Sequence, residues 1–394
     1  MFDHSFNSSE ITRLTALRHR LHMAPEAPRE EVETAKIITA ELAALNPDQL
    51  ITGIGGHGLA AVFDNGKAGP VLMFRSELDG LPIEDLADVP HRSRTSGRGH
   101  LCGHDGHMVS LLAFAGEIAK KRPAKGKIIV LFQPAEEDGS GATSMINDPA
   151  YAQLVPDFVY AYHNLPGMPF GHVSVAPGPA NCASRGMKVR FLGKTAHASM
   201  PETGVSPMPA LARLMPQLAA LSKGMPPAPH FTLATVTHVR MGEPVFGIAP
   251  SFAELFVTLR TLLDSAMAEM VANAEALAHQ AAKDFGLKVQ ISYDDIFVHC
   301  ENAPEAVADM RAALNALNIP HDTRGLPIRA SEDFGRFGHQ ILKNGKPHQP
   351  KSAMFYLGCG ENYPQLHNPD YDYPDGLTPI AAGVFIDIAR RVLG

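Results

Sequence analysis

The chain of 394 residues has no tryptophan, only four cysteines and no apolar run near the ~18 residues that a membrane-spanning helix requires. The cysteines lie far apart with no Cys-x-x-Cys pair, and residues 1–10 lack a secretion signal, so we expect reduced thiols in the cytoplasm. The formal net charge of -7 lacks the basic excess that phosphate binding needs. We therefore expect no membrane and no nucleic-acid partner, which leaves small molecules or peptides.

Short apolar runs alternate with segments of helical periodicity along most of the chain. Helical spacing marks residues 11–21, 32–45 and 108–118, and a last helix is predicted with Thr378 as its cap and Pro379 at its first position. This alternation predicts an α/β fold with a mostly parallel mixed sheet flanked by helices. The runs predicted as buried strands are Gly58 to Phe63, Val71 to Phe74, Ile128 to Phe132, Phe158 to Tyr162 and Ala353 to Leu357.

Residues 185–294 show a different order of elements. Strand, helix, strand, strand, helix and strand follow one another, and this βαββαβ order predicts an inserted α+β domain of the ferredoxin-like type. The insertion leaves the main domain in two parts, residues 1–184 and 295–394.

The densest chemical segment is His-Leu-Cys-Gly-His-Asp-Gly-His at residues 100–107, just before a predicted helix. In extended backbone, residues two apart point the same way, so Cys102 and His104 can present a thiolate and an imidazole to one point. The alternative is a polar loop in which histidines cluster by chance.

A second segment, Gln-Pro-Ala-Glu-Glu-Asp at residues 133–138, directly follows the predicted strand that ends at Phe132. Loops at the carboxyl ends of strands hold the sites of α/β sheets. A metal bound by one of the two neighbouring glutamates leaves the other free as a proton acceptor, whereas a solvated acidic turn is the alternative.

Two single histidines follow other predicted strands. Alone, His163 and His367 are more often structural histidines than metal ligands. Together with Cys102, His104 and Glu137, however, they place five N, O and S donors just beyond predicted strand ends. Such a set is enough for two transition-metal ions.

Signatures of other chemistries are missing. Residues 193–201 lack the first glycine of a phosphate loop, because position 188 is lysine, and the Gly-x-Gly-x-x-Gly at 53–58 precedes a strand instead of a helix. Neither His-Glu-x-x-His nor Gly-x-Ser-x-Gly occurs. Nucleotide binding and the single-zinc protease and serine hydrolase templates are therefore not supported.

Taken together, these segments resemble the family of aminoacylases, acetylornithine deacetylases and zinc carboxypeptidases. The similarity is greatest to its amidohydrolase branch, which contains hippurate hydrolases and auxin-conjugate hydrolases. It covers nearly the whole chain, and the combination of motifs is highly specific. The segments that match in order and spacing are Leu21-His22 to Pro25-Glu26, Arg75 to Pro82, His100 to His107, Gln133 to Glu137, Tyr162 to Asn164, Gly193 to Pro201, Ser331 to Phe334 and Leu366-His367.

The resemblance implies a dinuclear metal site and roles for residues around it. Glu136 would be the catalytic base, His197 in the inserted domain would stabilise the oxyanion, and Asp79 would orient a ligand. In relatives the inserted domain forms the dimer interface and its histidine reaches the partner's site, so a homodimer is expected. Arg260 matches the family's Thr-x-Arg and would clamp a substrate carboxylate, with a surface salt bridge as the alternative. The implied metal ligands are Cys102, His104, Glu137, His163 and His367.

Four positions depart from the pattern of the branch: Glu77, Arg185, Ser206 and Gly247. None is a proposed metal ligand. Gly247 replaces an asparagine that lines the substrate pocket in relatives, which leaves the identity of the substrate open.

The resulting hypothesis is a homodimeric, dinuclear metal-dependent amidohydrolase that cleaves N-acyl amino acids such as N-acetyl or N-benzoyl conjugates. One alternative is a dipeptidase or carboxypeptidase with the same centre, and another is a metal-dependent binding or sensing protein that has lost turnover. The roles of Glu136 and Glu137 could also be exchanged. Two Zn or Mn ions are expected, with Ni or Co also compatible, and a thiolate ligand slightly favours Zn.

Overall fold

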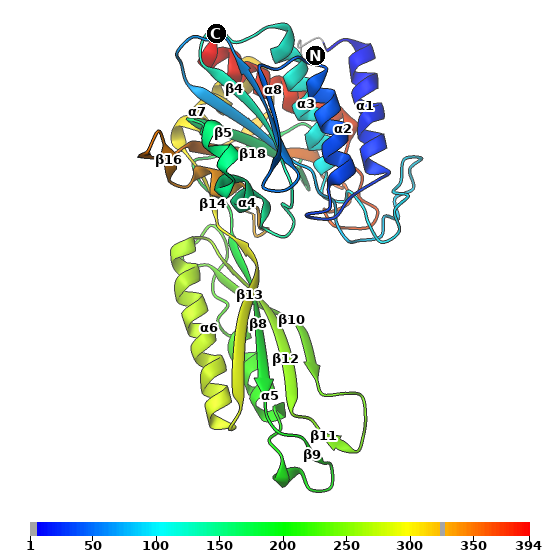
Figure 1. Ribbon diagram of the computed structural model, residues 1–394, viewed down its shortest axis with the longest axis vertical. Helices are drawn as coiled ribbons and strands as arrows, with labels where there is room; N and C mark the ends of the chain where they lie inside the picture. The colour runs from blue at the N-terminus through cyan, green and yellow to red at the C-terminus, as the bar shows by residue number, and fades with distance from the viewer. Residues whose placement is uncertain (1–5, 324–327) are drawn as a thin grey trace. The chain divides into compact units, whose positions relative to one another are not determined.

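The computed structural model describes residues 6–323 and 328–394, which form two compact units (Figure 1). Residues 6–180, 300–323 and 333–394 make up the first unit, and residues 181–299 and 328–332 make up the second. The second unit contains the whole insertion expected at 185–294. No helix in the described ranges combines the length and apolar character needed to cross a membrane.

The first unit is organised by an eight-stranded sheet in the order β1-β2-β4-β3-β5-β18-β6-β15. Its four central strands, β4, β3, β5 and β18, are parallel, whereas β1, β2 and β6 pair antiparallel with their inner neighbours. This confirms the mostly parallel mixed sheet. The strands are β1 (Gln49–Ile54), β2 (Gly58–Asp64), β3 (Val71–Glu77), β4 (Lys127–Gln133), β5 (Phe158–Pro166), β6 (Val173–Ser174), β15 (His321–Asp322) and β18 (Lys351–Gly360).

Helices cover this sheet, and α3 is the most deeply buried of them. It packs against α1, α8 and β3, and nearly all of its residues are buried, which explains why its apolar residues extend around the whole helix. The last helix begins at Thr378 with Leu377 as its cap, because a short 3-10 turn precedes it, so the prediction of Thr378 as the cap was wrong. The helices are α1 (Ser8–His22), α2 (Val32–Ala43), α3 (His104–Lys120), α4 (Gly141–Asn147), α7 (Pro304–Ala316) and α8 (Thr378–Leu393).

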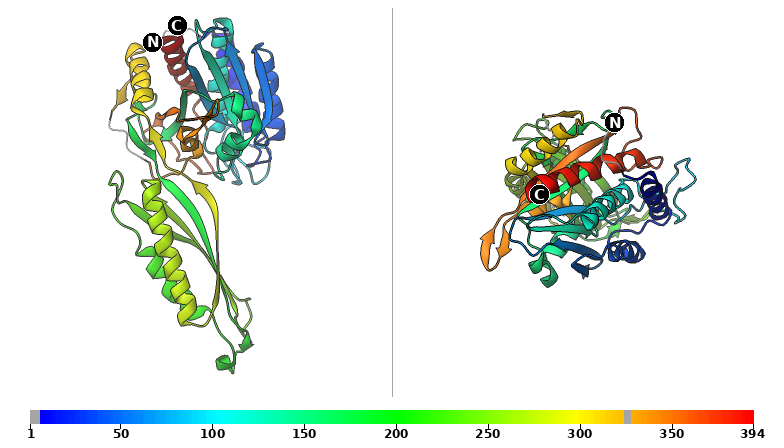
Figure 2. Two further views of the ribbon diagram at one scale, coloured as in Figure 1. Left: turned by 60° about the vertical axis from the view of Figure 1, so that its left-hand side comes forward. Right: turned by 90° about the horizontal axis from the view of Figure 1, so that it is seen from above.

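The second unit is an antiparallel sheet in the order β10-β12-β8-β13, with α5 and α6 packed on each other and on its strands. Figure 2 shows α6 running along this sheet. The arrangement confirms the ferredoxin-like prediction. Its elements are β8 (Ala183–Leu192), β9 (Ala196–His197), α5 (Met208–Ala219), β10 (Thr232–Met241), β11 (Ile248–Ala249), β12 (Phe252–Thr261), α6 (Asp264–Asp284) and β13 (Lys288–Phe297).

The sequence predicted the long strands of both units and missed β1 and the short strands. The missed strand β1 has only one fully buried residue, so it lacks an apolar signal. Short strands that were also missed are β6, β9, β11 and β15, together with β7 (Gly178–Asn181), β14 (Cys300–Asn302), β16 (Ile341–Lys343) and β17 (Lys346–His348).

Phe74 on β3 provides a test of the core beneath the central strands. Its buried ring lies 4.4 Å from Phe114, 5.0 Å from Phe385 and 5.3 Å from Tyr160, measured between ring centroids. We expect Phe74→Ala to lower the free energy of unfolding by about 3–5 kcal/mol, because the variant leaves a cavity. Urea denaturation measures this loss. The control Leu342→Ala, at a side chain that is 66% exposed, should change it by less than about 0.5 kcal/mol.

Candidate metal centre

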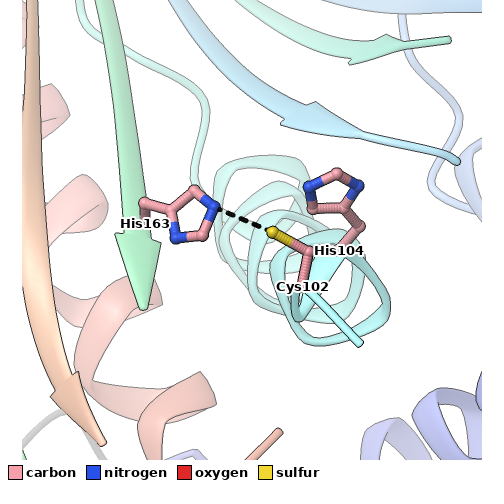
Figure 3. Close-up of side chains that lie close together, drawn as sticks. All are labelled: Cys102, His104 and His163. Atoms are coloured by element: carbon pink, nitrogen blue, oxygen red, sulfur yellow. Dashed lines mark hydrogen bonds between the residues drawn. The ribbon is translucent and has the colours of Figure 1, made fainter. Parts of the chain in front are cut away.

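The five predicted metal ligands lie close together at the carboxyl ends of the parallel strands. The candidate base, Glu136, lies beside two of them, His104 and Glu137. Their ligand atoms form three groups, within each of which the atoms lie within 4.8 Å of one another. Cys102, His104 and Glu137 each belong to two of these groups, so the groups overlap. Figure 3 shows the Cys102 sulfur directed at the ring of His163, with His104 beside it, and the Sγ to Nε2 distance is 3.5 Å. The groups are Cys102, His104 and His163; Cys102, Glu137 and His367; and His104, Glu136 and Glu137.

Local backbone geometry places the thiol and the first imidazole at the start of α3. Gly103 between them has a φ of 100°, and a Cβ there would lie 2.5 Å from Oδ1 of Asn164. Only glycine fits both the left-handed conformation and the close approach. The backbone N–H of His367, itself at a φ of 65°, donates to the carbonyl of Leu101 at 2.8 Å, which ties the last histidine to the same segment.

Hydrogen bonds select the tautomer of two of the histidines. His104 donates from Nδ1 to the carbonyl of Asp79 at 2.9 Å, and His163 donates from Nδ1 to the carbonyl of Asn164 at 2.7 Å. Both rings therefore direct Nε2 toward the cluster, where it is available to a metal, as in metal-bound histidines. Nε2 of His104 is buried and has no hydrogen-bond partner among the described residues, which fits a ligand atom. His163 lies inside β5, which runs on to Pro166, so the prediction that it lies beyond the strand end was wrong.

The two glutamates extend from the loop after β4. Nε2 of His104 is 3.9 Å from Oε2 of Glu136 and 3.8 Å from Oε1 of Glu137, and Nε2 of His367 is 3.6 Å from Oε2 of Glu137. Oδ2 of Asp79 accepts the backbone N–H of Glu137 at 2.9 Å. Asp79 therefore contacts both His104 and the glutamate loop, which suits the orienting role that the resemblance implies.

The electrostatics of the cluster favour a bound cation. Burial raises the pKa of the Cys102 thiol well above its ordinary value, and the charges of Glu137 and Glu136 raise it further. Desolvation lowers the pKa of His163 to about 3, so this ring is a neutral donor. Burial also lowers the pKa of His104, but the hydrogen bond to Asp79 and nearby carboxylates outweigh it and raise the value to about 10. A divalent cation would supply the positive charge that makes a thiolate and neutral imidazoles the stable forms. The donor set and its charge thus fit two transition-metal ions.

The sequence did not predict the buried network that holds the base candidate. Arg75 on β3 donates to Oε1 of Gln133 at 2.8 Å and to Oδ1 of Asp333 at 2.9 Å, and Gln133 also donates to Asp333. The backbone N–H of Asp333 donates to Oε1 of Glu136 at 3.4 Å. Charged residues inside an otherwise apolar strand were the available signal, because a buried charge needs partners.

A second buried network lies behind His163. His107 bonds through Nδ1 to Oε2 of Glu77 at 2.8 Å and through Nε2 to Oδ1 of Asn164 at 2.5 Å. Asn164 also donates to the hydroxyl of Tyr371 at 2.5 Å. Glu77, noted as a departure from the branch pattern, is therefore a structural partner of His107. The sequence pointed to this segment but not to the role of His107.

His197 and Arg260 belong to the second unit. His197 is exposed on β9, and its Nδ1 accepts the backbone N–H of Ser199 at 3.1 Å, so a neutral ring carries its proton on Nε2. Arg260 donates from Nη1 to the carbonyl of Arg329 at 2.9 Å and to the hydroxyl of Ser331 at 2.7 Å. Both of these partners are neutral oxygen acceptors.

Comparisons with known proteins agree with this geometry. The chain is 32% identical over 393 residues to N-acetyl-L-cysteine deacetylase of Bacillus subtilis, which covers 97% of this chain and 88% of the relative. It is 27% identical over 385 residues to hippurate hydrolase of Campylobacter jejuni, which covers 96% of each chain. A solved Bacillus subtilis structure, described as a dinuclear metal binding peptidase from the M20 family, shares the fold with a TM-score of 0.80 at 22% identity, over 98% of this chain and 99% of that one.

Residues 73–391 match the sequence model of Peptidase family M20/M25/M40, which is most of the chain. Seven of the eight segments that carry the resemblance noted from the sequence lie inside this range, and the first, at residues 21–26, precedes it. The chain therefore belongs to Peptidase family M20/M25/M40, and it is a hydrolase that acts on amide bonds.

Proposed function

We propose that this protein hydrolyses the amide bond of N-acyl amino acids with two bound divalent metal ions. The observation that carries the proposal is that five N, O and S donors form overlapping groups of three, and that a further carboxylate, Glu136, lies in one of these groups. The names of the relatives, which act on acetylated or benzoylated amino acids, support this class of substrate. The proposed metal ligands are Cys102, His104, Glu137, His163 and His367.

In the proposed mechanism, Glu136 moves a proton from water to the leaving amine. Bound metal ions would polarise the substrate carbonyl and lower the pKa of a water toward about 7. Glu136 accepts the proton of the attacking water and returns it to the amine nitrogen when the C–N bond breaks. The backbone N–H of Asp333 holds one oxygen of Glu136 and so orients the carboxylate. His197 donates from Nε2 to the oxyanion, and Arg260 binds the substrate carboxylate.

Further features of the proposal concern assembly, location and metal. We propose a homodimer formed through the second unit, where the exposed apolar residues Val245, Phe246 and Ile248 are available for contact.

The four cysteines are buried and form no disulfide with one another, which supports a reducing, cytoplasmic location. Zn is favoured over Mn, Ni and Co because one ligand is a thiolate.

A substrate panel tests the proposed class of substrate. We expect N-acetyl and N-benzoyl amino acids to be hydrolysed with a kcat/KM at least about tenfold above that for unblocked dipeptides, since a tenfold difference needs only about 1.4 kcal/mol of binding in the pocket. Chromatographic separation and quantification of the released amino acid measures the rates for both kinds of substrate. A preference for dipeptides would instead favour the dipeptidase alternative, and metal binding without hydrolysis of any member would favour the sensing protein.

Substitution of the base candidate separates proton transfer from metal binding. We expect Glu136→Gln to lower kcat by about 10²- to 10⁴-fold, because the variant cannot accept the proton of water. Elemental analysis should still find two metal ions per chain. The matched variant Glu137→Gln should lose metal instead. The reverse pattern would show that the two glutamates exchange roles.

The raised pKa of the Cys102 thiol leads to a prediction of how metal affinity depends on pH. Its pKa is raised in the protein, so the thiol is protonated at neutral pH and metal binding must release that proton. The apparent affinity should therefore fall as pH falls, by about tenfold per pH unit for each proton released. Competition with a chelator at pH 8, 7 and 6 measures it. Cys102→Asp should show a shallower dependence over this range, because an aspartate ligand is already ionised there; an equal slope would contradict the thiolate assignment.

A further inference from the structure

Glu31, at the start of α2, is a fully buried carboxylate that holds backbone amides from two different segments. Its Oε1 accepts the N–H of Arg29 at 2.9 Å and the N–H of Ala135, more than 100 positions away, at 2.8 Å. Its Oε2 is buried and has no hydrogen-bond partner among the described residues. Burial of a carboxylate costs free energy, so the presence of Glu31 at this position calls for an explanation.

The distant partner, Ala135, has an unfavourable backbone conformation directly before Glu136. Its φ is 50°, a left-handed conformation that costs a residue with a side chain about 1–2 kcal/mol. The carbonyl of Ala135 accepts the N–H of Gly141 at 2.9 Å, so hydrogen bonds hold both of its backbone groups. A Cβ at Gly141 would lie 1.7 Å from the carbonyl oxygen of Pro134, which shows how tightly this loop turns.

Two buried carboxylates hold the backbone on either side of Glu136. Glu31 accepts the N–H of Ala135, and Asp79 accepts the N–H of Glu137 at 2.9 Å. Burial, followed by the charge of Asp79, raises the pKa of Glu31 to about 7, so the two carboxyls lie close enough to repel each other. The repulsion between these two carboxyls is unfavourable, but both of them hold the loop that bears the base.

Capping of α2 does not account for Glu31. The N-terminal amides of that helix are already satisfied by Glu26, which accepts the N–H groups of Glu33 at 3.1 Å and Thr34 at 2.7 Å. The bond from Glu31 to Ala135 crosses to the loop after β4 instead. Its direct effect is therefore on that loop.

We propose that Glu31 is a positioning residue for Glu136: by accepting the N–H of Ala135 it stabilises the left-handed turn that aims the base. This inference rests on the proposed function, in which Glu136 is the general base. A displacement of about 1 Å of a reacting group can cost about 10²-fold in rate. Loss of the acceptor should therefore lower kcat far more than it changes KM.

The test compares Glu31→Ala with Glu31→Gln in the full-length, metal-loaded enzyme. We expect Glu31→Ala to lower kcat on an N-acyl amino acid by about 10²-fold, with KM changed less than about threefold and two metal ions retained. Glu31→Gln keeps an acceptor oxygen and should restore kcat to within about fivefold of the unmodified enzyme. Hydrogen exchange of the loop at residues 134–140 should be at least tenfold faster in Glu31→Ala and nearly unchanged in Glu31→Gln.

Glu26→Ala is the matched control, because it removes the other carboxylate that accepts backbone amides at the start of α2. It should lower thermal stability but leave both kcat and loop exchange nearly unchanged. Equal loss of kcat in Glu26→Ala and Glu31→Ala, or normal loop exchange in Glu31→Ala, would overturn the inference. If Glu31→Ala does not fold, a loss of kcat in Glu31→Gln as large as that in Glu136→Gln overturns it. Failure of the unmodified enzyme to hydrolyse any N-acyl amino acid would instead contradict the proposed function, and the exchange measurement would still report on the loop.

Discussion

Mutual repulsion of closely spaced electron donors is the constraint on which the rest of this structure depends. A thiol, two carboxylates and three imidazoles meet in groups whose atoms lie within 4.8 Å, mostly out of water. Without a cation, the carboxylates raise the pKa of the thiol and keep a proton on His104, so neither group is in the form that binds a metal. They tolerate this proximity because the surrounding fold holds them from behind and because a divalent cation would reverse the sign of the interaction.

Support from behind comes repeatedly from buried carboxyl groups that accept backbone N–H groups. Asp79 holds the amide of Glu137, Glu31 holds that of Ala135, and Asp333 accepts the amide of Ala142 at 2.9 Å while it pairs with Arg75. Hydrogen bonds to ionised acceptors are short and strong, so they can fix a loop backbone in strained conformations. The loop after β4 thus gains a rigidity that loops rarely have, which suits a base that must act on one defined water.

The parallel centre of the sheet determines which segments can reach the site. Strands β3, β4, β5 and β18 run in the same direction, so the loops that follow β3 and β4 leave at one edge. Asp79 and the two glutamates come from these loops, and His163 comes from within the carboxyl-terminal half of β5. Residues that lie more than 200 positions apart in sequence, such as Glu137 and His367, can therefore lie in one group of candidate ligands.

The sequence by itself determined the α/β class, the inserted ferredoxin-like unit and the residue types of the metal centre. These features are local: apolar runs, helical spacing and Cys, His and Glu side chains placed after buried strands. It could not predict the exposed strand β1, the extension of β5 past His163 or the partners of Arg75, because none of these has a local pattern. Only the tertiary structure decided which buried charges pair, which histidine nitrogen is left for a metal, and that Glu31 contacts Ala135. Each of these depends on distances between atoms of segments that lie far apart in the sequence, and such distances cannot be read from the order of the residues.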